Sequence, residues 1–298
     1  MNRKILVWLI LCCIWSTTWV AIKIGLDVIP PFTFAALRFL IAGNILALIA
    51  AARKTQLPQS REEWNTLWQS GLLSVAFNFG AVFWGEQYVS SGLASVLNST
   101  VPLFGIVFAH KLVAGEQMTR KKLVGVLLGI LGVAIIFSDQ LHAEGSVALW
   151  ASVVIVLGAA AVSYSAVLVK VRAKRVNAVV LSAGQMLVAV PVLLGAAMMN
   201  GERLSEIRWN YEAAFALLYL AVIGSCVAFV LYYWLIKQIQ VTKALMIVLV
   251  VPILAVAVGI LTRGEELTWR LFVGGGLIIL GVGTIVLNRS LFGLKKEY

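Results

Sequence analysis

Apolar residues fill ten long stretches of the chain, and short polar segments separate them. Each stretch has close to the ~20 mainly apolar residues that a helix needs to cross a bilayer. The stretches show no polar face, which the helices of a water-soluble bundle would need. The pattern therefore predicts an all-α polytopic membrane protein whose ten transmembrane helices lie near residues 5–25, 33–52, 66–88, 92–113, 121–138, 147–169, 178–199, 213–236, 242–262 and 270–288.

The order of these helices is repeated along the chain. Residues 94–102 match residues 244–252, and each segment is apolar or small-polar and ends in proline. Such self-similarity indicates a duplicated unit, and we expect five-helix repeats at residues 1–140 and 141–298. The further matches join Phe83 to Tyr233, Trp84 to Trp234, Ser16 to Ser163, Lys23 to Lys170, Gly125 to Gly274, and Arg38 to Gln185.

The number of helices in each repeat predicts how the two halves are related. Because five is odd, the second copy begins on the opposite side of the membrane, and the halves become inverted repeats. Inverted repeats place a substrate site near the midplane at their interface, and rocking of one half against the other gives alternating access. The sequence therefore predicts a single integrated transport domain.

Basic residues outnumber acidic ones by 24 to 13, a balance that could indicate a nucleic-acid partner. Their positions argue against it, because Lys and Arg gather in alternate loops, such as residues 53–61, 120–122 and 170–175. Cytoplasmic loops carry this excess in membrane proteins. We therefore expect both termini in the cytoplasm and no nucleic-acid partner.

Signals for other chemistry are weak. Cys12, Cys13 and Cys226 fall inside predicted helices without metal-ligand spacing, so we expect no metal site. The chain has no phosphate-binding loop, which argues against ATP hydrolysis, and we expect no cofactor. His110 and His142 fall on opposite sides of the membrane, so no catalytic cluster forms and we expect no enzyme. A scaffold or receptor is disfavoured by the inverted repeat.

Three ionisable residues, Lys23, Arg38 and Glu86, lie within predicted helices near the extracellular side of the first half. Charged groups are costly inside a membrane and usually face a wet cavity or a partner. They could form a structural ion pair that anchors helix ends. Alternatively they could form an outer gate or a site for an anion, since Arg can bind a carboxylate bidentately. Proton-coupled transport would have to use Glu86, and a uniporter is equally compatible with the sequence.

Pro102 and Pro252 lie inside the fourth and ninth predicted helices, where proline frees a carbonyl group and kinks the helix. These kinks could be hinges or could serve packing alone. The fifth and tenth helices are rich in glycine, and Gly125 and Gly129 would let helix backbones approach closely. Close packing within a monomer is favoured over a homodimer interface, although both stay open.

The chain resembles the drug/metabolite transporter superfamily, in its ten-helix EamA-type branch of bacterial inner-membrane exporters. The residues that carry the resemblance are the segment 15–23, Pro30, Pro31, Arg38, Phe39, the segment 94–102, Gly115, Glu116, Gly125 and Gly132. The resemblance covers nearly the whole chain and implies secondary efflux of small metabolites, often amino acids or related amphiphiles, through a central cavity. Substrates differ widely across such a fold.

Aromatic walls with a few hydroxyl and amide groups would suit an amphiphilic substrate in that cavity. An importer or exchanger of anionic phosphate compounds is the alternative, because Lys23 and Arg38 could bind phosphate. Small molecules and membrane lipid are the expected partners. The residues we expect to line the cavity are Trp15, Ser16, Trp19, Asn78, Trp84, Asn98, Ser163, Tyr164, Tyr233 and Trp234.

Overall fold

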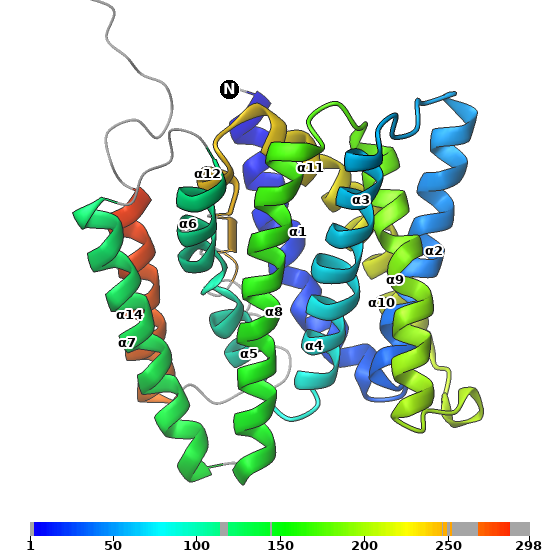
Figure 1. Cartoon of the computed structure of the whole chain (residues 1–298). Helices are drawn as coiled ribbons and strands as arrows, with labels where there is room; N and C mark the ends of the chain where they lie inside the picture. The colour runs from blue at the N-terminus through cyan, green and yellow to red at the C-terminus, as the bar shows by residue number, and fades with distance from the viewer. Residues whose placement is uncertain are drawn as a thin grey trace, which may run out of the picture.

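The structure is a computed structural model that describes residues 3–113, 119–143, 145–245, 247–248, 251 and 268–286. All regular structure in these residues is helical, and the helices pack side by side in a bundle (Figure 1). The elements are α1 (Arg3–Leu26), α2 (Pro31–Ala52), α3 (Arg61–Ser70), η1 (Gly71–Phe77), α4 (Asn78–Gly85), α5 (Ser91–Asn98), α6 (Val101–Leu112), α7 (Arg120–Ala143), α8 (Gly145–Arg172), α9 (Ala178–Met199), η2 (Leu204–Glu206), α10 (Tyr211–Ala221), η3 (Val222–Val227), α11 (Ala228–Gln238), α12 (Val241–Leu245) and α14 (Trp269–Val286).

Several of these helices can cross a membrane, which confirms the prediction of an all-α, multi-pass membrane protein. Two more described helices, α7 and α14, contain the shorter apolar segments Leu123–Gly132 and Phe272–Gly281. Most of the predicted helix at 242–262 lies outside the described residues. The six segments that are long and apolar enough are Arg3–Leu26, Pro31–Ala52, Leu93–Leu112, Ser146–Arg172, Ala178–Met199 and Tyr211–Gln238.

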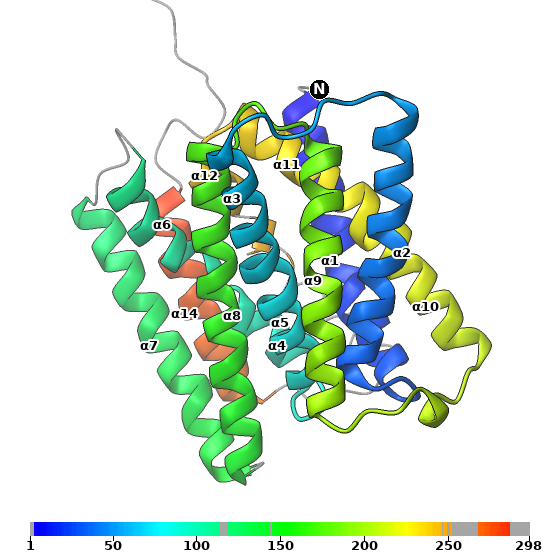
Figure 2. The same ribbon diagram turned by 45° about the vertical axis from the view of Figure 1, so that its right-hand side comes forward.

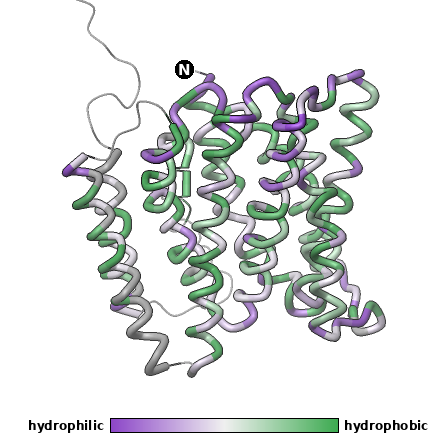
Figure 3. The backbone as a smooth tube through the Cα atoms, in the orientation of Figure 1, coloured by the Kyte–Doolittle hydropathy of each residue, from purple (hydrophilic) through white to green (hydrophobic). Residues whose placement is uncertain are grey.

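The chain crosses the bundle back and forth (Figures 1 and 2), so α1 begins and α14 ends at the same end of the molecule. We call this the terminal end, and we call the end where α1 stops and α14 starts the far end. Figure 3 shows apolar residues along the helices and many of the hydrophilic ones in the loops of the terminal end. This distribution fits helices whose middle parts face hydrocarbon.

Two helices contain a π-helical turn at the same place in the two halves. In the first half α3 continues through η1 into α4, and in the second half α10 continues through η3 into α11. A π turn adds one residue to the helical repeat, and such turns are frequent at functional sites. The wider turn changes which side chains the following helix presents to its neighbours. Nothing in the apolar pattern predicts these turns.

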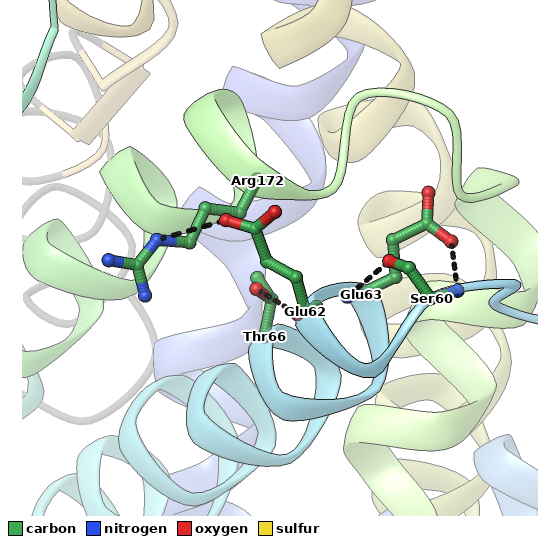
Figure 4. A network of polar contacts seen from close by, with 5 residues as sticks. All are labelled: Ser60, Glu62, Glu63, Thr66 and Arg172. Atoms are coloured by element: carbon green, nitrogen blue, oxygen red, sulfur yellow. Dashed lines mark hydrogen bonds and ion pairs between the residues drawn. The ribbon is translucent and has the colours of Figure 1, made fainter.

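Polar contacts join the two halves at both ends of the bundle. At the terminal end, Arg172 from α8 lies 3.6 Å from Glu62 in the first turn of α3 (Figure 4). Both side chains of that pair are solvent-exposed, so it adds little stability. Ser60 and Glu63 form a capping box that fixes the start of this helix. At the far end, the Glu202 carboxylate accepts hydrogen bonds from the backbone N–H of Phe32 and Thr33, at 3.1 and 2.8 Å. A carboxylate is favoured there by the dipole of α2.

Helices α7 and α14 pack against each other along their length, at one side of the bundle (Figure 1). A Cβ atom placed on Gly132 would overlap the carbonyl oxygen of Gly274, and one placed on Gly281 would overlap that of Gly125. Backbone atoms cannot rotate away, so only glycine allows this approach. The two contacts use the glycines that the sequence repeat pairs, Gly125 with Gly274 and Gly132 with Gly281.

Replacing Gly132 by alanine should therefore push α7 and α14 apart. We expect Gly132→Ala to lower stability by about 1–3 kcal/mol, as overpacking does in other cores. The control is Gly276→Ala in α14, because nothing lies within 4 Å of a Cβ atom at that position. Thermal unfolding of the purified protein in detergent measures both, and equal melting temperatures would contradict close packing at Gly132.

Candidate functional site

A cavity of about 100 Å³ lies among helices of both halves. Its described walls come from α1, η1, α4, α5 and α6 in the first half, and from α8, α11 and α12 in the second. Leu245, at the end of α12, and Val248 and Val251, which follow it in the sequence, complete the described lining. The cavity therefore lies where the sequence repeat predicts a site, between the two copies.

Aromatic rings from α1, α4 and α11 form one wall of the cavity. The ring of Trp15 lies 5.1 Å from that of Tyr232 and 6.4 Å from that of Phe229, in edge-to-face contacts. Phe229 in turn lies 5.8 Å from Phe79 and 6.2 Å from Tyr233. Such contacts stabilise one another and leave few rotamers free. The wall is a rigid apolar surface that can support the apolar part of a ligand.

Two residues with amide side chains also line the cavity, Asn78 on α4 and Asn98 on α5. The Oδ1 atoms of both are buried and have no hydrogen-bond partner in the part of the chain that the structure describes. A buried polar atom without a partner costs about 1–3 kcal/mol. Water or a ligand that pairs with these amides would recover that free energy.

The cavity carries no fixed charge on its described walls. Its lining there consists of aromatic and aliphatic side chains, the two amides, and the hydroxyl groups of Thr18, Ser74, Tyr232 and Tyr233. The Ser74 hydroxyl is already used, since it donates to the carbonyl oxygen of Ser70 at 2.7 Å. A ligand therefore meets neutral hydrogen-bonding groups on an otherwise apolar surface.

Half of the expected cavity residues line this cavity: Trp15, Trp19, Asn78, Asn98 and Tyr233. The sequence reasoning missed Thr18, Ser74, Phe79, Phe229 and Tyr232. Helical spacing gave a signal for Thr18, because a residue three positions after Trp15 shares its helix face. The others lie in or next to the π turns, where ordinary helical spacing does not predict the exposed face.

The other five expected residues lie elsewhere. The Ser16 hydroxyl donates to the carbonyl oxygen of Cys12 at 2.6 Å, and the Ser163 hydroxyl donates to Ala159 and to Val101, at 2.8 and 2.6 Å. The three aromatic residues contact other partners. Tyr164 packs edge-on against Phe108, and Trp84 packs against Tyr88 in a tilted arrangement. Trp234 lies under the guanidinium of Arg3.

The two prolines also have different outcomes. Pro102 is buried in the first turn of α6, just after α5 ends at Asn98. The hydroxyl groups of Ser99 and Thr100 donate to the carbonyl oxygens of Val96 and Leu97, at 2.5 and 2.7 Å, and the same carbonyls accept the backbone N–H groups of these two residues. A hinge at this break stays a prediction. Pro252 lies outside the described residues.

Arg38 joins α2 of the first half to the π turn of the second. Its side chain is buried; Nε donates to the Ser225 hydroxyl at 2.8 Å and Nη2 to the carbonyl oxygen of Gly224 at 3.2 Å. The guanidinium carbon lies 4.8 Å from the centre of the Phe79 ring and 5.1 Å from that of Phe39, which are cation–π distances. Phe79 also lines the cavity, so it contacts both the ligand space and this positive charge.

Lys23 binds the backbone where α4 ends. Its ammonium donates to the carbonyl oxygen of Glu86 and, at 3.0 Å, to that of Val89. The side chain of Glu86 is fully buried at the same place. Cations are favoured at the C-terminal end of a helix, where carbonyl groups lack partners. Lys23 therefore holds the end of the third helix of its half.

Lys170 makes the matching contact in the second half. Its ammonium donates to the carbonyl oxygens of Ile236 and Ile239, both at 2.8 Å, where α11 ends. In the sequence repeat Lys170 pairs with Lys23 and Ile236 with Glu86. Because α1 runs to the far end and α8 runs to the terminal end, the two contacts lie at opposite ends of the bundle (Figure 1). The repetition favours the anchoring interpretation of Lys23 over the gate.

Variants of the two lysines separate these interpretations. We expect Lys23→Met and Lys170→Met to lower the melting temperature to a similar extent, because each variant leaves two carbonyl groups without a charged donor. A hydrogen bond to a charged group contributes at most about 1.5–3 kcal/mol to stability. Transport by the correctly folded fraction should keep its KM in both. A large rise in KM for the Lys23 variant alone would instead make Lys23 a substrate-binding residue.

The fold and the cavity define a class: a multi-pass helical membrane protein with an internal, mostly apolar site between its halves. The chain belongs to the EamA-like transporter family, whose pattern matches residues 2–138 and again residues 149–287. The resemblance found in the sequence is thereby confirmed, and with it a general role in membrane transport.

Named relatives agree with this assignment. The chain is 30% identical to the uncharacterized transporter YoaV of Bacillus subtilis (strain 168), over 95% of each chain. It is 31% identical to the uncharacterized inner membrane transporter YedA of Escherichia coli (strain K12), over 95% of this chain and 90% of the relative. A solved structure described only as the crystal structure of a protein shares the fold, with a TM-score of 0.72 at 20% identity over 95% of this chain and 97% of its own.

Proposed function

We propose that the protein is a secondary transporter that exports amino acids or related amphiphilic metabolites across a bacterial inner membrane. The observation that carries the proposal is the cavity between the halves, which combines a rigid aromatic wall with the amides of Asn78 and Asn98. An amino acid has an apolar side chain for such a wall and polar groups for such amides. Binding sites for small molecules commonly have this composition.

The distribution of charge supports an amino acid over a phosphate compound. A phosphate carries two negative charges near neutral pH and is usually bound by cations or clustered N–H groups. The described cavity walls contain no Lys or Arg. Lys23 binds backbone carbonyl groups, and Arg38 reaches the cavity only through the ring of Phe79. A carboxylate balanced by its own ammonium group needs less compensation, and the field of Arg38 favours its negative end.

We further propose that residues 1–140 and 141–298 are inverted repeats with five transmembrane helices each, and that both termini are cytoplasmic. Three observations support this proposal. The family pattern matches twice, once in each half. The lysine contacts recur at opposite ends of the bundle, and the glycine contacts of α7 recur in α14. Basic loops at the terminal end support the orientation.

The position of the cavity supports alternating access. Its described walls come from helices of both halves of the chain. Motion of one repeat or bundle against the other, with the site between them, would open such a cavity first to one side of the membrane and then to the other.

Uptake into liposomes containing the purified protein tests the function. The probes are labelled amino acids with aromatic and aliphatic side chains, beside labelled sugar phosphates. Saturable movement of an amino acid supports the proposal. If only the phosphate esters move, the alternative function, exchange of anionic phosphate compounds, replaces it.

Removal of an amide tests the binding site. We expect Asn78→Ala to raise the KM for a transported amino acid about tenfold, which corresponds to ~1.4 kcal/mol and to the loss of one hydrogen bond to the substrate. The matched control is Asn44→Ala, because Asn44 is exposed on α2 and its amide donates to the Leu40 carbonyl of its own helix. Equal KM values for both variants would remove Asn78 from the site.

Glu86 is the buried acid of the described chain, and we propose it as the proton-carrying group of a proton-coupled exporter. We expect a pH gradient across the liposome membrane to accelerate transport by the natural protein, and Glu86→Gln to abolish that acceleration while leaving exchange at equal pH. The glutamine has the same size but cannot carry a proton. Uphill transport by the Glu86→Gln variant would exclude proton coupling through Glu86 and favour a uniporter or another energy source.

A further inference from the structure

A second pocket opens at the terminal end of the bundle, away from the central cavity. It measures about 640 Å³ and lies between the start of α1, the loop after α2, the start of α9 and the end of α11. Its described lining contains three basic side chains, Arg3, Arg175 and Lys237, and no acidic one. The function proposed above uses none of these residues.

The basic residues reach the pocket from three separate segments. Arg3 precedes the apolar part of α1, Arg175 lies in the loop between α8 and α9, and Lys237 lies near the end of α11. Arg3 and Arg175 are solvent-exposed. Lys237 is half-buried and donates to the carbonyl oxygen of Val176, which fixes its position. Folding therefore brings together three basic residues that are far apart in the sequence.

One acid acts on this cluster from outside the pocket. Glu63 interacts electrostatically with Lys237. Its carboxylate, however, accepts hydrogen bonds from the backbone N–H groups of Gln59 and Ser60, at 2.7 and 3.4 Å. Glu63 is thus part of the α3 cap and leaves Arg3 and Arg175 available to an anion.

The rest of the described lining has three polar side chains, Thr55, Gln56 and Asn177, and a group of apolar ones. Val7 is buried, and Val179, Val230 and Leu231 also line the pocket. Trp234 lies beneath Arg3, whose guanidinium carbon is 5.3 Å from the ring centre. Tryptophan is enriched at the level of the lipid head groups. The next turns of α1 expose Leu6, Leu9 and Ile10, which face hydrocarbon in a membrane.

We infer that this pocket binds the phosphate of an anionic phospholipid head group, with an acyl chain along the apolar side. Two exposed arginines can bind phosphate oxygens bidentately, which a lysine cannot do. Basic pockets between transmembrane helices on the cytoplasmic side are suited to anionic lipid head groups. The apolar side of the pocket favours a lipid over a free phosphate, because a small anion would leave Val7, Val230 and Leu231 without contact.

The site is independent of the transported substrate. A lipid bound there would contact α1 and α11, which also form the aromatic wall of the cavity. Both helices would be held at the terminal end by one ligand. The first consequence is a gain in stability with anionic lipid, by mass action.

Lipid binding to the purified full chain tests the inference. The probes are palmitoyl-oleoyl-phosphatidylglycerol and palmitoyl-oleoyl-phosphatidylcholine added to detergent micelles, with native mass spectrometry to count bound lipid and thermal unfolding to measure stability. We expect phosphatidylglycerol to bind and to raise the melting temperature more than phosphatidylcholine does. In the double variant Arg3→Gln and Arg175→Gln we expect its affinity to fall about thirtyfold, since each charge near the surface contributes about fivefold.

Two further double variants make the result decisive. Arg61→Gln with Arg120→Gln removes the same charge from exposed positions outside the pocket and should keep the affinity. Arg3→Lys with Arg175→Lys should keep part of it, which would show that loss in the glutamine variant is not misfolding. Equal loss in the Arg61 and Arg120 variant, or no loss in the Arg3 and Arg175 variant, would overturn the inference. Complete competition by glycerol phosphate would replace the lipid with a free phosphate anion.

Discussion

The constraint on which this structure depends is that hydrocarbon offers no hydrogen bonds to the backbone. Each place where a helix ends or breaks inside the bundle must therefore obtain donors from side chains. Lys23 and Lys170 supply them where α4 and α11 end. The two lysines, which look unusual in so apolar a chain, are used in this way.

This constraint also explains why the cavity is neutral. A charge that stabilises a helix end is held by carbonyl oxygens and cannot at the same time bind a substrate. The buried guanidinium of Arg38 is likewise held by Ser225 and Gly224 and enclosed by aromatic rings. The amide oxygens of Asn78 and Asn98 are among the buried atoms without a hydrogen-bond partner in the described residues, and both side chains line one cavity from two different helices. Selectivity therefore has to come from shape, from neutral hydrogen bonds and from the field of a charge behind the wall.

The family resemblance is confirmed, and five of the ten expected residues line the cavity. The sequence also predicted the helical class and a multi-pass membrane protein, because the length of an apolar run depends only on local composition. It failed where tertiary packing decides. Trp84 and Trp234 follow Phe83 and Tyr233 by one residue, and one step around a helix moves a side chain by about 100°. Phe83 and Tyr233 are buried, while Trp84 and Trp234 are half-buried and contact other partners. Ser16 and Ser163 bind carbonyl groups of their own helices, a choice that composition does not reveal.

The two halves differ at the contact between the second helix and the π turn of the opposite half. In one direction Arg38 donates from two nitrogens to η3, and in the other Gln185 donates once, at 2.6 Å, to Ser70 beside η1. If the halves were identical, exchanging their conformations would cost nothing and neither access state would be preferred. A buried charge held by two hydrogen bonds is harder to displace than one neutral amide, because breaking it strands a cation. In the alternating access proposed above, the asymmetry at residues 38 and 185 would favour the state in which the Arg38 contact is closed.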